Sequence, residues 1–290
     1  MSVVAPNGRT IAERIGVSTV CFRHLELAPA LERIASLGAD AVDLAALRGL
    51  CEHVSPDGEP AQLRKAATVV EASGLKPLAL NADPESFDEQ DFAVVLNRVE
   101  RLTEFCATVG APLLILPGGA ALHPGDNGAA ANDVRARLAQ VIEGSLLAAA
   151  IGQRYGVRVA VEAPHYLRLA RTLDLADQLG SQLPLVFDTS HVAAGGFDPG
   201  EAFSQRAHQI VHVQLRDAVP GDIRRAVGHG DIDFARFFDA SESAGYQGAF
   251  VLELETHNSP YTSKDDEVTA ALSAMFLAAS ESGHDGREDQ

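Results

Sequence analysis

The feature that most constrains the fold is an alternation of short apolar runs with segments of helical periodicity, repeated eight times along 290 residues. The runs are IGVSTVCF (15–22), ADAVDLA (39–45), LKPLALN (75–81), APLLILPGG (111–119), VRVAVEAPH (157–165), LPLVFDTSH (183–191), IVHVQLRDA (210–218) and AFVLELE (249–255). Such runs are typical of strands that are buried on both faces of a parallel sheet. A repeated strand-then-helix unit predicts an α/β fold, either a closed barrel or a doubly wound sheet.

The connections between the runs favour the barrel. No GxGxxG motif follows the first run, so a dinucleotide-binding sheet lacks its usual sequence support. No linker interrupts the eight repeats, and 290 residues is an ordinary length for a (β/α)8 barrel. We therefore predict a single-domain (β/α)8 TIM barrel over residues 1–290, with its core at about 14–280.

Helical periodicity is clearest in four of the connecting segments. In the first, Leu27, Leu31 and Ile34 share one face of a helix that Gly38 is expected to end. The other predicted helices cover residues 88–109, 132–155 and 265–282. Between the seventh and eighth runs, a long loop is expected at 218–231.

Composition restricts the classes of partner. The net charge is −17, and phosphate backbones are bound by clustered Lys and Arg, so we expect no nucleic-acid partner. Cys21, Cys51 and Cys106 show no CxxC spacing, which favours reduced thiols in a cytoplasmic protein. We find no signal-peptide pattern and no apolar stretch of about 18 residues, so we expect no membrane association. The oligomeric state stays open, and a homo-oligomer is compatible with the sequence.

Polar residues end four consecutive apolar runs. Glu162, Asp188, Gln214 and Glu253 close the fifth to eighth runs, and the carboxyl ends of barrel strands meet at one mouth. A single polar residue at a strand end is usually a cap or turn residue, but four at equivalent points favour a shared site. Three carboxylates in one cavity would repel each other unless a cation neutralised them. Hard oxygen donors predict one divalent metal ion, Mn²⁺ or Mg²⁺.

Five segments together resemble the xylose-isomerase-like barrel superfamily of sugar isomerases, epimerases and inosose dehydratases. They are VEAPH (161–165), FDTSHVAAGGFDP (187–199), VHVQLRDA (211–218), GHGDIDF (228–234) and GYQGAFVLELE (245–255). The resemblance extends over about residues 14–280 and implies that the metal ligands are Glu162, Asp188, Gln214 and Glu253. It also implies that Glu162 and Glu253 are the catalytic acid and base residues.

One position departs from the usual pattern of this superfamily. Most of its sugar epimerases carry His where this chain has Gln214, whereas the hydroxypyruvate-isomerase branch reads H-V-Q as this chain does. The side-chain oxygen of Gln214 can still bind a metal ion. His212 lies two residues earlier on the same predicted strand and is a reserve ligand candidate.

The resemblance also suggests substrate-binding residues. His191 and His165 each follow a predicted ligand by three residues, His53 follows the second run, and Arg216 follows the seventh. Each of the three histidines could instead be an ordinary surface-loop residue, and Arg216 could be an ordinary solvated arginine. Asn81 and Asp83 close the third run, where they could belong to the site or equally form a turn before Pro84. Glu255 lies beyond the predicted ligand position on the eighth run.

These residues predict a metal-dependent isomerase or epimerase acting on a small sugar or polyol-derived carbonyl compound. The metal would acidify the C–H beside the carbonyl, and Glu162 and Glu253 would move the proton through a cis-enediolate. A lyase resembling inosose dehydratase, or one that cleaves oxo-glycosides, begins with the same step and stays open. A non-catalytic binding barrel or a partner subunit also stays open as an alternative. Phosphodiester cleavage, known on this fold, is disfavoured by the net charge of −17.

Overall fold

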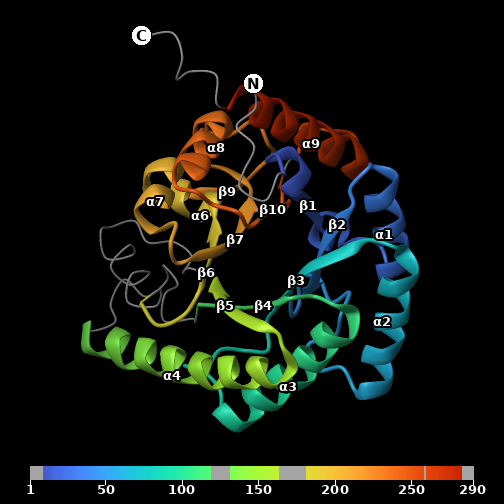
Figure 1. Ribbon diagram of the computed structural model, residues 1–290, viewed down its shortest axis with the longest axis vertical. Coiled ribbons are helices and arrows are strands. Elements are labelled where there is room, and N and C mark those ends of the chain that lie inside the picture. The colour runs from blue at the N-terminus through green and yellow to red at the C-terminus, as the bar shows by residue number, and fades with distance from the viewer. Residues whose placement is uncertain (1–8, 119–130, 163–180, 258, 283–290) are drawn as a thin grey trace.

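The computed structural model describes residues 9–118, 131–162, 181–257 and 259–282, and its parallel strands close into a barrel (Figure 1). The barrel strands are β1 (Ile15–Ser18), β2 (Ala41–Ala46), β3 (Lys76–Ala82), β4 (Leu113–Leu116), β5 (Arg158–Glu162), β6 (Leu185–Asp188), β7 (Ile210–Leu215) and β10 (Ala249–Leu252). Around the barrel they follow the order β1-β10-β7-β6-β5-β4-β3-β2. Each of the eight predicted runs overlaps one of these strands, so the predicted fold class is confirmed.

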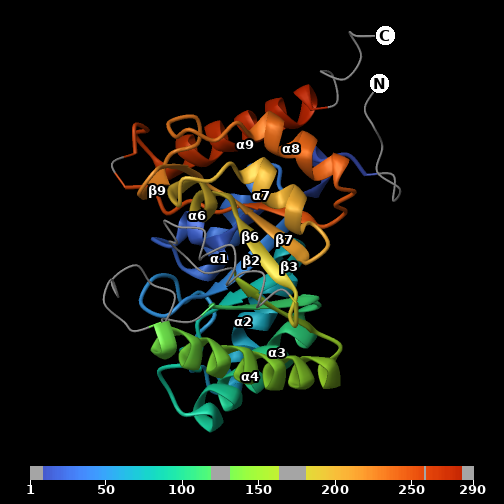
Figure 2. The same cartoon turned by 90° about the vertical axis from the view of Figure 1, so that its left-hand side faces the viewer.

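Helices surround the strands on the outside (Figure 1). They are α1 (Leu27–Ser36), α2 (Pro60–Ser73), α3 (Phe92–Val109), α4 (Ala131–Tyr155), α6 (Thr189–Ala194), α7 (Pro199–Arg206), α8 (Phe234–Ser243) and α9 (Lys264–Glu281). Two short 3-10 helices, η1 (Ala12–Arg14) and η2 (Thr19–Phe22), flank β1. In side view, α8 and α9 cover one side of the barrel and α3 and α4 the opposite side (Figure 2).

Capping side chains explain where several helices begin and end. The predicted helix 88–109 begins only at Phe92, because the Asp91 side chain accepts a hydrogen bond from Ala93 N at 2.8 Å and caps α3. Gly110 ends the same helix with φ 74°, a conformation that glycine adopts without strain. Among the described residues, no helix is both long and apolar enough to span a lipid bilayer.

Alternate residues of each barrel strand face opposite ways. Leu80, Leu114 and Val213 belong to the large core between strands and helices, whereas Ile115 and Val186 belong to a cluster inside the barrel. This alternation follows from the two-residue period of a strand. It also means that the polar residues at the strand ends on the interior faces must point into the barrel mouth.

The connection after β7 is more ordered than the predicted loop at 218–231. It contains an antiparallel hairpin, β8 (Asp217–Val219) and β9 (Asp222–Arg225). The buried Asp217 carboxylate then accepts backbone hydrogen bonds from Gly228 and Gly230, both at 2.9 Å. A Cβ at Gly230 would collide with that carboxylate. Asp217 therefore holds the GHGDIDF segment against the end of β7.

Candidate metal and catalytic centre

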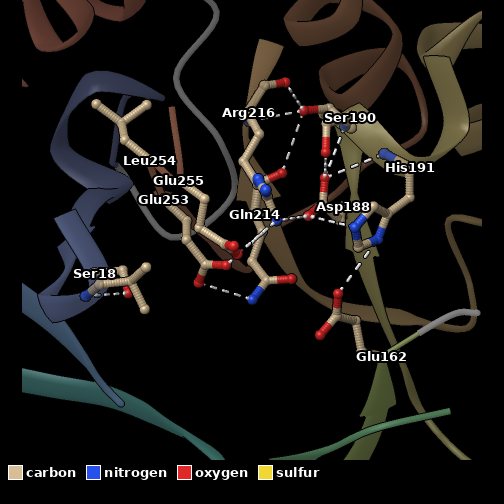
Figure 3. Close-up of polar contacts among 12 residues, drawn as sticks. Ser18, Glu162, Asp188, Ser190, His191, Gln214, Arg216, Glu253, Leu254 and Glu255 are labelled. Atoms are coloured by element: carbon tan, nitrogen blue, oxygen red, sulfur yellow. Dashed lines mark hydrogen bonds and ion pairs between the residues drawn. The ribbon is translucent and has the colours of Figure 1, made fainter. Parts of the chain in front are cut away.

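The four predicted ligands lie at one end of four neighbouring strands. Glu162 and Asp188 are the last residues of β5 and β6, Gln214 is the last but one of β7, and Glu253 directly follows β10. Because β5, β6, β7 and β10 are adjacent in the barrel, the four side chains share one arc of the mouth (Figure 3). The structure thus brings the predicted set together, and their roles as ligands stay predictions.

His191 joins the carboxylates of β5 and β6. Its Nδ1 lies 3.3 Å from Glu162 Oε1, and its Nε2 lies 3.5 Å from Asp188 Oδ2. The residue is buried in the first turn of α6, which Asp188 caps by accepting a hydrogen bond from Ser190 N at 2.7 Å. One donor atom from each of Glu162, Asp188 and His191 lies within 4.8 Å of the others, a spacing that could hold a metal ion. The resemblance implied that His191 contacts substrate or orients a ligand, and its position here would also allow it to be a ligand itself.

Gln214 offers an unused oxygen to this site. The side chain is fully buried, and its Nε2 donates a hydrogen bond to Glu253 Oε2 at 3.1 Å. Its Oε1 has no hydrogen-bond partner among the described residues. Buried acceptors in folded proteins are nearly always paired, and an amide oxygen is a good ligand for Mg²⁺ or Mn²⁺. The donor set therefore fits a hard divalent cation.

Arg216 occupies the centre of the acidic cluster. Its Nη1 lies 3.3 Å from Asp188 Oδ2, 3.7 Å from Glu253 Oε1 and 3.1 Å from Glu255 Oε1 (Figure 3). The side chain is buried, which makes the solvated-arginine alternative wrong. Arg216 supplies one positive charge to a group of four carboxylates that also includes Glu162. With all four carboxylates ionised, the cluster would keep a net negative charge that protons or a bound cation could neutralise.

Burial dominates the proton affinities in this cluster. It raises the pKa of Glu162 well above its usual value, and the nearby Asp188 and Glu253 charges add to the effect. Burial likewise raises the pKa of Glu253 to about 8, although Arg216 opposes this shift. Burial lowers the pKa of Arg216, but Asp188, Glu255 and Glu253 outweigh it and raise the pKa overall. Without a metal ion, the carboxylates hold protons that they would lose to a bound cation.

A family model described as a xylose isomerase-like TIM barrel matches residues 31–279. The chain belongs to this family. The match covers β2 to β10 and thus the whole arc that carries the acidic cluster.

Individual relatives of this xylose isomerase-like barrel are more distant. The chain is 30% identical to inosose dehydratase of Geobacillus thermodenitrificans over 92 residues, 26% of this chain and 31% of that protein. It is 30% identical to the rhizopine catabolism protein MocC of Rhizobium meliloti over 124 residues, 35% of this chain and 38% of that protein. The matches thus span about a third of the length of each curated relative.

Solved structures resemble the barrel over most of its length. The E. coli 3-keto-D-glucoside 4-epimerase has a TM-score of 0.70 at 16% identity, covering 91% of this chain and 99% of its own. A D-tagatose 3-epimerase-like protein has a TM-score of 0.71 at 16% identity, covering 92% and 98%. At this identity the likeness shows the fold, and the activities in those names belong to the proteins that bear them.

The other predicted substrate-binding histidines of the xylose isomerase-like barrel have different surroundings. His53 is half-buried, with Nε2 2.8 Å from Leu25 O and Nδ1 3.3 Å from Cys51 Sγ. Burial lowers its pKa, which favours the neutral ring. Both ring nitrogens have protein partners, and contact with substrate stays a prediction. His165 lies outside the described residues.

His212, the reserve ligand, points into the barrel as expected but has a partner of its own. Its Nε2 lies 2.7 Å from Asp43 Oδ2, and both side chains are buried. Asp43 lies on β2, so this pair crosses the barrel interior, a region usually filled by branched apolar residues. Sequence reasoning missed the pair. The available signal was a charged residue inside the apolar run at 39–45.

Proposed function

We propose that this barrel is a divalent-metal-dependent isomerase or epimerase acting on a small sugar or polyol-derived carbonyl compound. Its chemistry would begin with removal of a proton from the carbon next to the carbonyl. The observation that carries the proposal is the buried cluster itself, in which Glu162 and Glu253 have raised pKa values beside an unpartnered Gln214 oxygen. Perturbed carboxylates gathered in one cavity are characteristic of catalytic sites.

The metal ion, Mn²⁺ or Mg²⁺, would be held by Glu162, Asp188, Gln214 and Glu253. When bound, it supplies Lewis acidity that makes the C–H beside the carbonyl easier to deprotonate. His191 lies between Glu162 and Asp188 and would orient the Glu162 carboxylate or contact a substrate hydroxyl. Arg216, already paired with three carboxylates, would hold their positions and donate hydrogen bonds to substrate oxygens.

The two glutamates suit acid–base chemistry from two directions. Glu162 ends β5 and Glu253 follows β10, and β6 and β7 separate these strands around the barrel. A substrate between them would meet one carboxylate on each side. One glutamate could then remove a proton and the other could return it, on a neighbouring carbon in an isomerase or on the opposite face in an epimerase.

A lyase of the inosose dehydratase type is the second candidate. One specific observation favours it: the curated relatives with 30% identity are an inosose dehydratase and a rhizopine catabolism protein. Such an enzyme removes the same proton and then expels a leaving group from the next carbon. A non-catalytic barrel is a third reading, but it would not need to keep all four predicted ligands in one cluster.

The net charge and the state of the cysteines suit a soluble enzyme that acts on small molecules. The net charge of −17 opposes a nucleic-acid partner. The three cysteines are buried and free, which suits a reducing compartment such as the cytoplasm.

Isotope exchange in D₂O tests the proposal. The metal-loaded protein is incubated with ketoses, tetronates, hydroxypyruvate and inososes, and deuterium is sought at the carbon beside the carbonyl. An isomerase or epimerase returns a labelled isomer, and a lyase returns an unsaturated or cleaved product. If no compound in the panel exchanges or turns over, the non-catalytic reading replaces this one.

A further inference from the structure

Asn81 carries an amide that has no hydrogen-bond partner among the described residues. It is the last-but-one residue of β3, and only 4% of its surface is exposed. Its side chain forms no hydrogen bond with any part of the chain that the structure describes. The amide offers two donors and an acceptor with two lone pairs. Neither of its polar atoms is fully shut off from solvent, so the group is open to a ligand that enters from the barrel mouth.

The side chain points into the barrel. Leu80 and Ala82, on either side of it, belong to the core between strands and helices, whereas Ala79 belongs to the interior cluster. The strand neighbours of Asn81 are Ala45 and Ile115, neither of which offers a polar side chain. The amide therefore faces the barrel interior, with apolar residues beside it on both neighbouring strands.

The other polar residues on this part of the wall each have at least one partner. Ser18 Oγ accepts a hydrogen bond from Val20 N at 3.2 Å. Asp43 Oδ2 lies 2.7 Å from His212 Nε2, while Asp43 Oδ1 has no hydrogen-bond partner among the described residues. Neither is hydrogen-bonded to Asn81. The orphaned Oε1 of Gln214 has an explanation in metal binding, and Asn81 has no equivalent explanation.

Strand order places Asn81 across the mouth from the acidic cluster. In the closed barrel, β3 stands opposite β7, with three strands between them in either direction. Asn81 and Gln214 are each the last but one residue of their strands. A substrate whose reacting carbons lie at the carboxylates would extend its far end toward Asn81.

The chain immediately after Asn81 is held firmly. Asp83 N donates to Ala46 O at 2.9 Å, and Asp83 Oδ1 accepts from Glu85 N at 3.0 Å. Glu85 has φ 72°, an uncommon value for a residue other than glycine. Arg98 holds Glu85 in this conformation by an ion pair with its carboxylate, and it also donates a hydrogen bond of 3.2 Å to Pro84 O. A fixed strand end pre-organises the amide for binding.

We propose that Asn81 is a substrate-binding residue that holds a hydroxyl group remote from the reacting carbons. A hydroxyl both donates and accepts, as the amide does, and an uncharged amide has no preference for an anion. Asn81 thus favours substrates with a polyhydroxy tail over short keto acids. The inference rests on the proposed function, because it takes the acidic cluster as the reacting end.

The test compares Asn81→Leu and Asn81→Ala with the wild type, and uses Asn97→Leu, at an exposed position of α3, as the matched control. Long substrates are D-fructose and an inosose, and the short substrate is dihydroxyacetone, which lacks a distal hydroxyl. We expect the KM for the long substrate to rise roughly 10-fold in both Asn81 variants. The KM for dihydroxyacetone stays unchanged, and the melting temperature of Asn81→Leu does not fall, because no protein hydrogen bond is lost.

Two results overturn the inference. One is an unchanged KM for every long substrate. The other is an equal loss with long and short substrates together with a lower melting temperature, which is the signature of a structural amide. If the wild type exchanges deuterium with no compound, the proposed function fails, and thermal stabilisation by D-fructose then tests Asn81 separately. Stabilisation of the wild type but not of Asn81→Leu supports the inference, and no difference between them overturns it.

Discussion

The two halves of the barrel mouth differ in the number of charged side chains that they bury. The arc of β5, β6, β7 and β10 buries Glu162, Asp188, Glu253 and Arg216 within one connected cluster. The arc of β1 to β4, called here the neutral arc, buries one carboxylate, Asp43, which pairs with His212, and its Asn81 side chain has no hydrogen bond among the described residues. Under the proposed function, the charged arc would carry out the chemistry and the neutral arc would bind the hydroxyl groups of the substrate.

The two arcs are also supported in different ways. Behind the charged arc, Phe187 of β6 and Phe250 of β10 pack against aromatic rings from the helices, for example Phe203 at 5.3 Å and Phe238 at 5.2 Å between ring centroids. Near the neutral arc, Arg98 joins the loops after β2 and β3 through ion pairs. Buried carboxylates destabilise the fold. The aromatic packing lies behind the charged arc, where it offsets that cost, and it is a stronger support than the ion pairs near the neutral arc.

The largest expected effect comes from removing the proposed bases on the charged arc. Glu162→Gln and Glu253→Gln each keep an oxygen for the metal but cannot take up a proton. Deuterium exchange should fall by about 10²–10⁴-fold in each variant, while metal affinity measured by calorimetry is largely retained. Glu104→Gln, at an exposed position of α3, is the control. Normal exchange in either active-site variant would remove that glutamate from the mechanism.

Metal binding should respond to the ligand chemistry at β7 and β6. Gln214→Leu removes the unpartnered Oε1 and should weaken Mn²⁺ binding by at least ~10-fold, by analogy with the effect of losing groups around metal sites. Gln214→His should retain binding, because imidazole is also a ligand. Asp188→Ala should abolish stoichiometric metal by elemental analysis. If Gln214→Leu and the wild type bind Mn²⁺ with equal affinity, the ligand is His191 or water and not Gln214.

The stability of the metal-free protein should depend on pH in the direction set by the raised pKa of Glu253. Its pKa is about 8 in the fold against 4.5 unfolded, so the native state binds the extra proton between these values. Stability is therefore highest near pH 5 and is lost as the pH rises toward 8. We expect the melting temperature to fall by roughly 5–10 °C between pH 5.5 and pH 8.

Two comparisons sharpen this pH prediction. Glu253→Gln should flatten the profile, because the titrating carboxyl is gone. Saturating Mn²⁺ should raise the melting temperature most at pH 8, where the ion meets ionised carboxylates. A wild-type profile that rises from pH 5.5 to pH 8 would contradict the assigned burial of Glu253.

The smallest effect is expected on the neutral arc. Arg98→Gln removes the ion pairs with Asp57 and Glu85, whose carboxylates are partly exposed, and should cost only about 1 kcal/mol of stability. The looser loops should raise KM a few-fold while leaving Mn²⁺ affinity unchanged. Arg154→Gln, which removes an exposed pair with Glu100, is the control for general charge loss. Weakened Mn²⁺ binding in Arg98→Gln would show that the arcs are coupled.

Local patterns were sufficient to predict the barrel and the position of its acidic residues. Apolar runs have the length of buried strands, and a carboxylate at the end of such a run must emerge at the barrel mouth. The predicted loop after β7 was wrong in part, because the β8–β9 hairpin is short and has little apolar alternation. His191 was placed near the site by its spacing from Asp188, but its burial between two carboxylates required the structure.

The sequence by itself determined the strand-and-helix alternation and which strands end in carboxylates, since both are properties of residues near each other in the chain. Only the tertiary structure decided which polar groups meet. Barrel closure pairs Asp43 with His212 and sets Arg216 among Asp188, Glu253 and Glu255. It also leaves the amide of Asn81 without a partner among the described residues. The physical reason is that side-chain direction and packing across a closed sheet depend on residues from distant strands, and no local period records them.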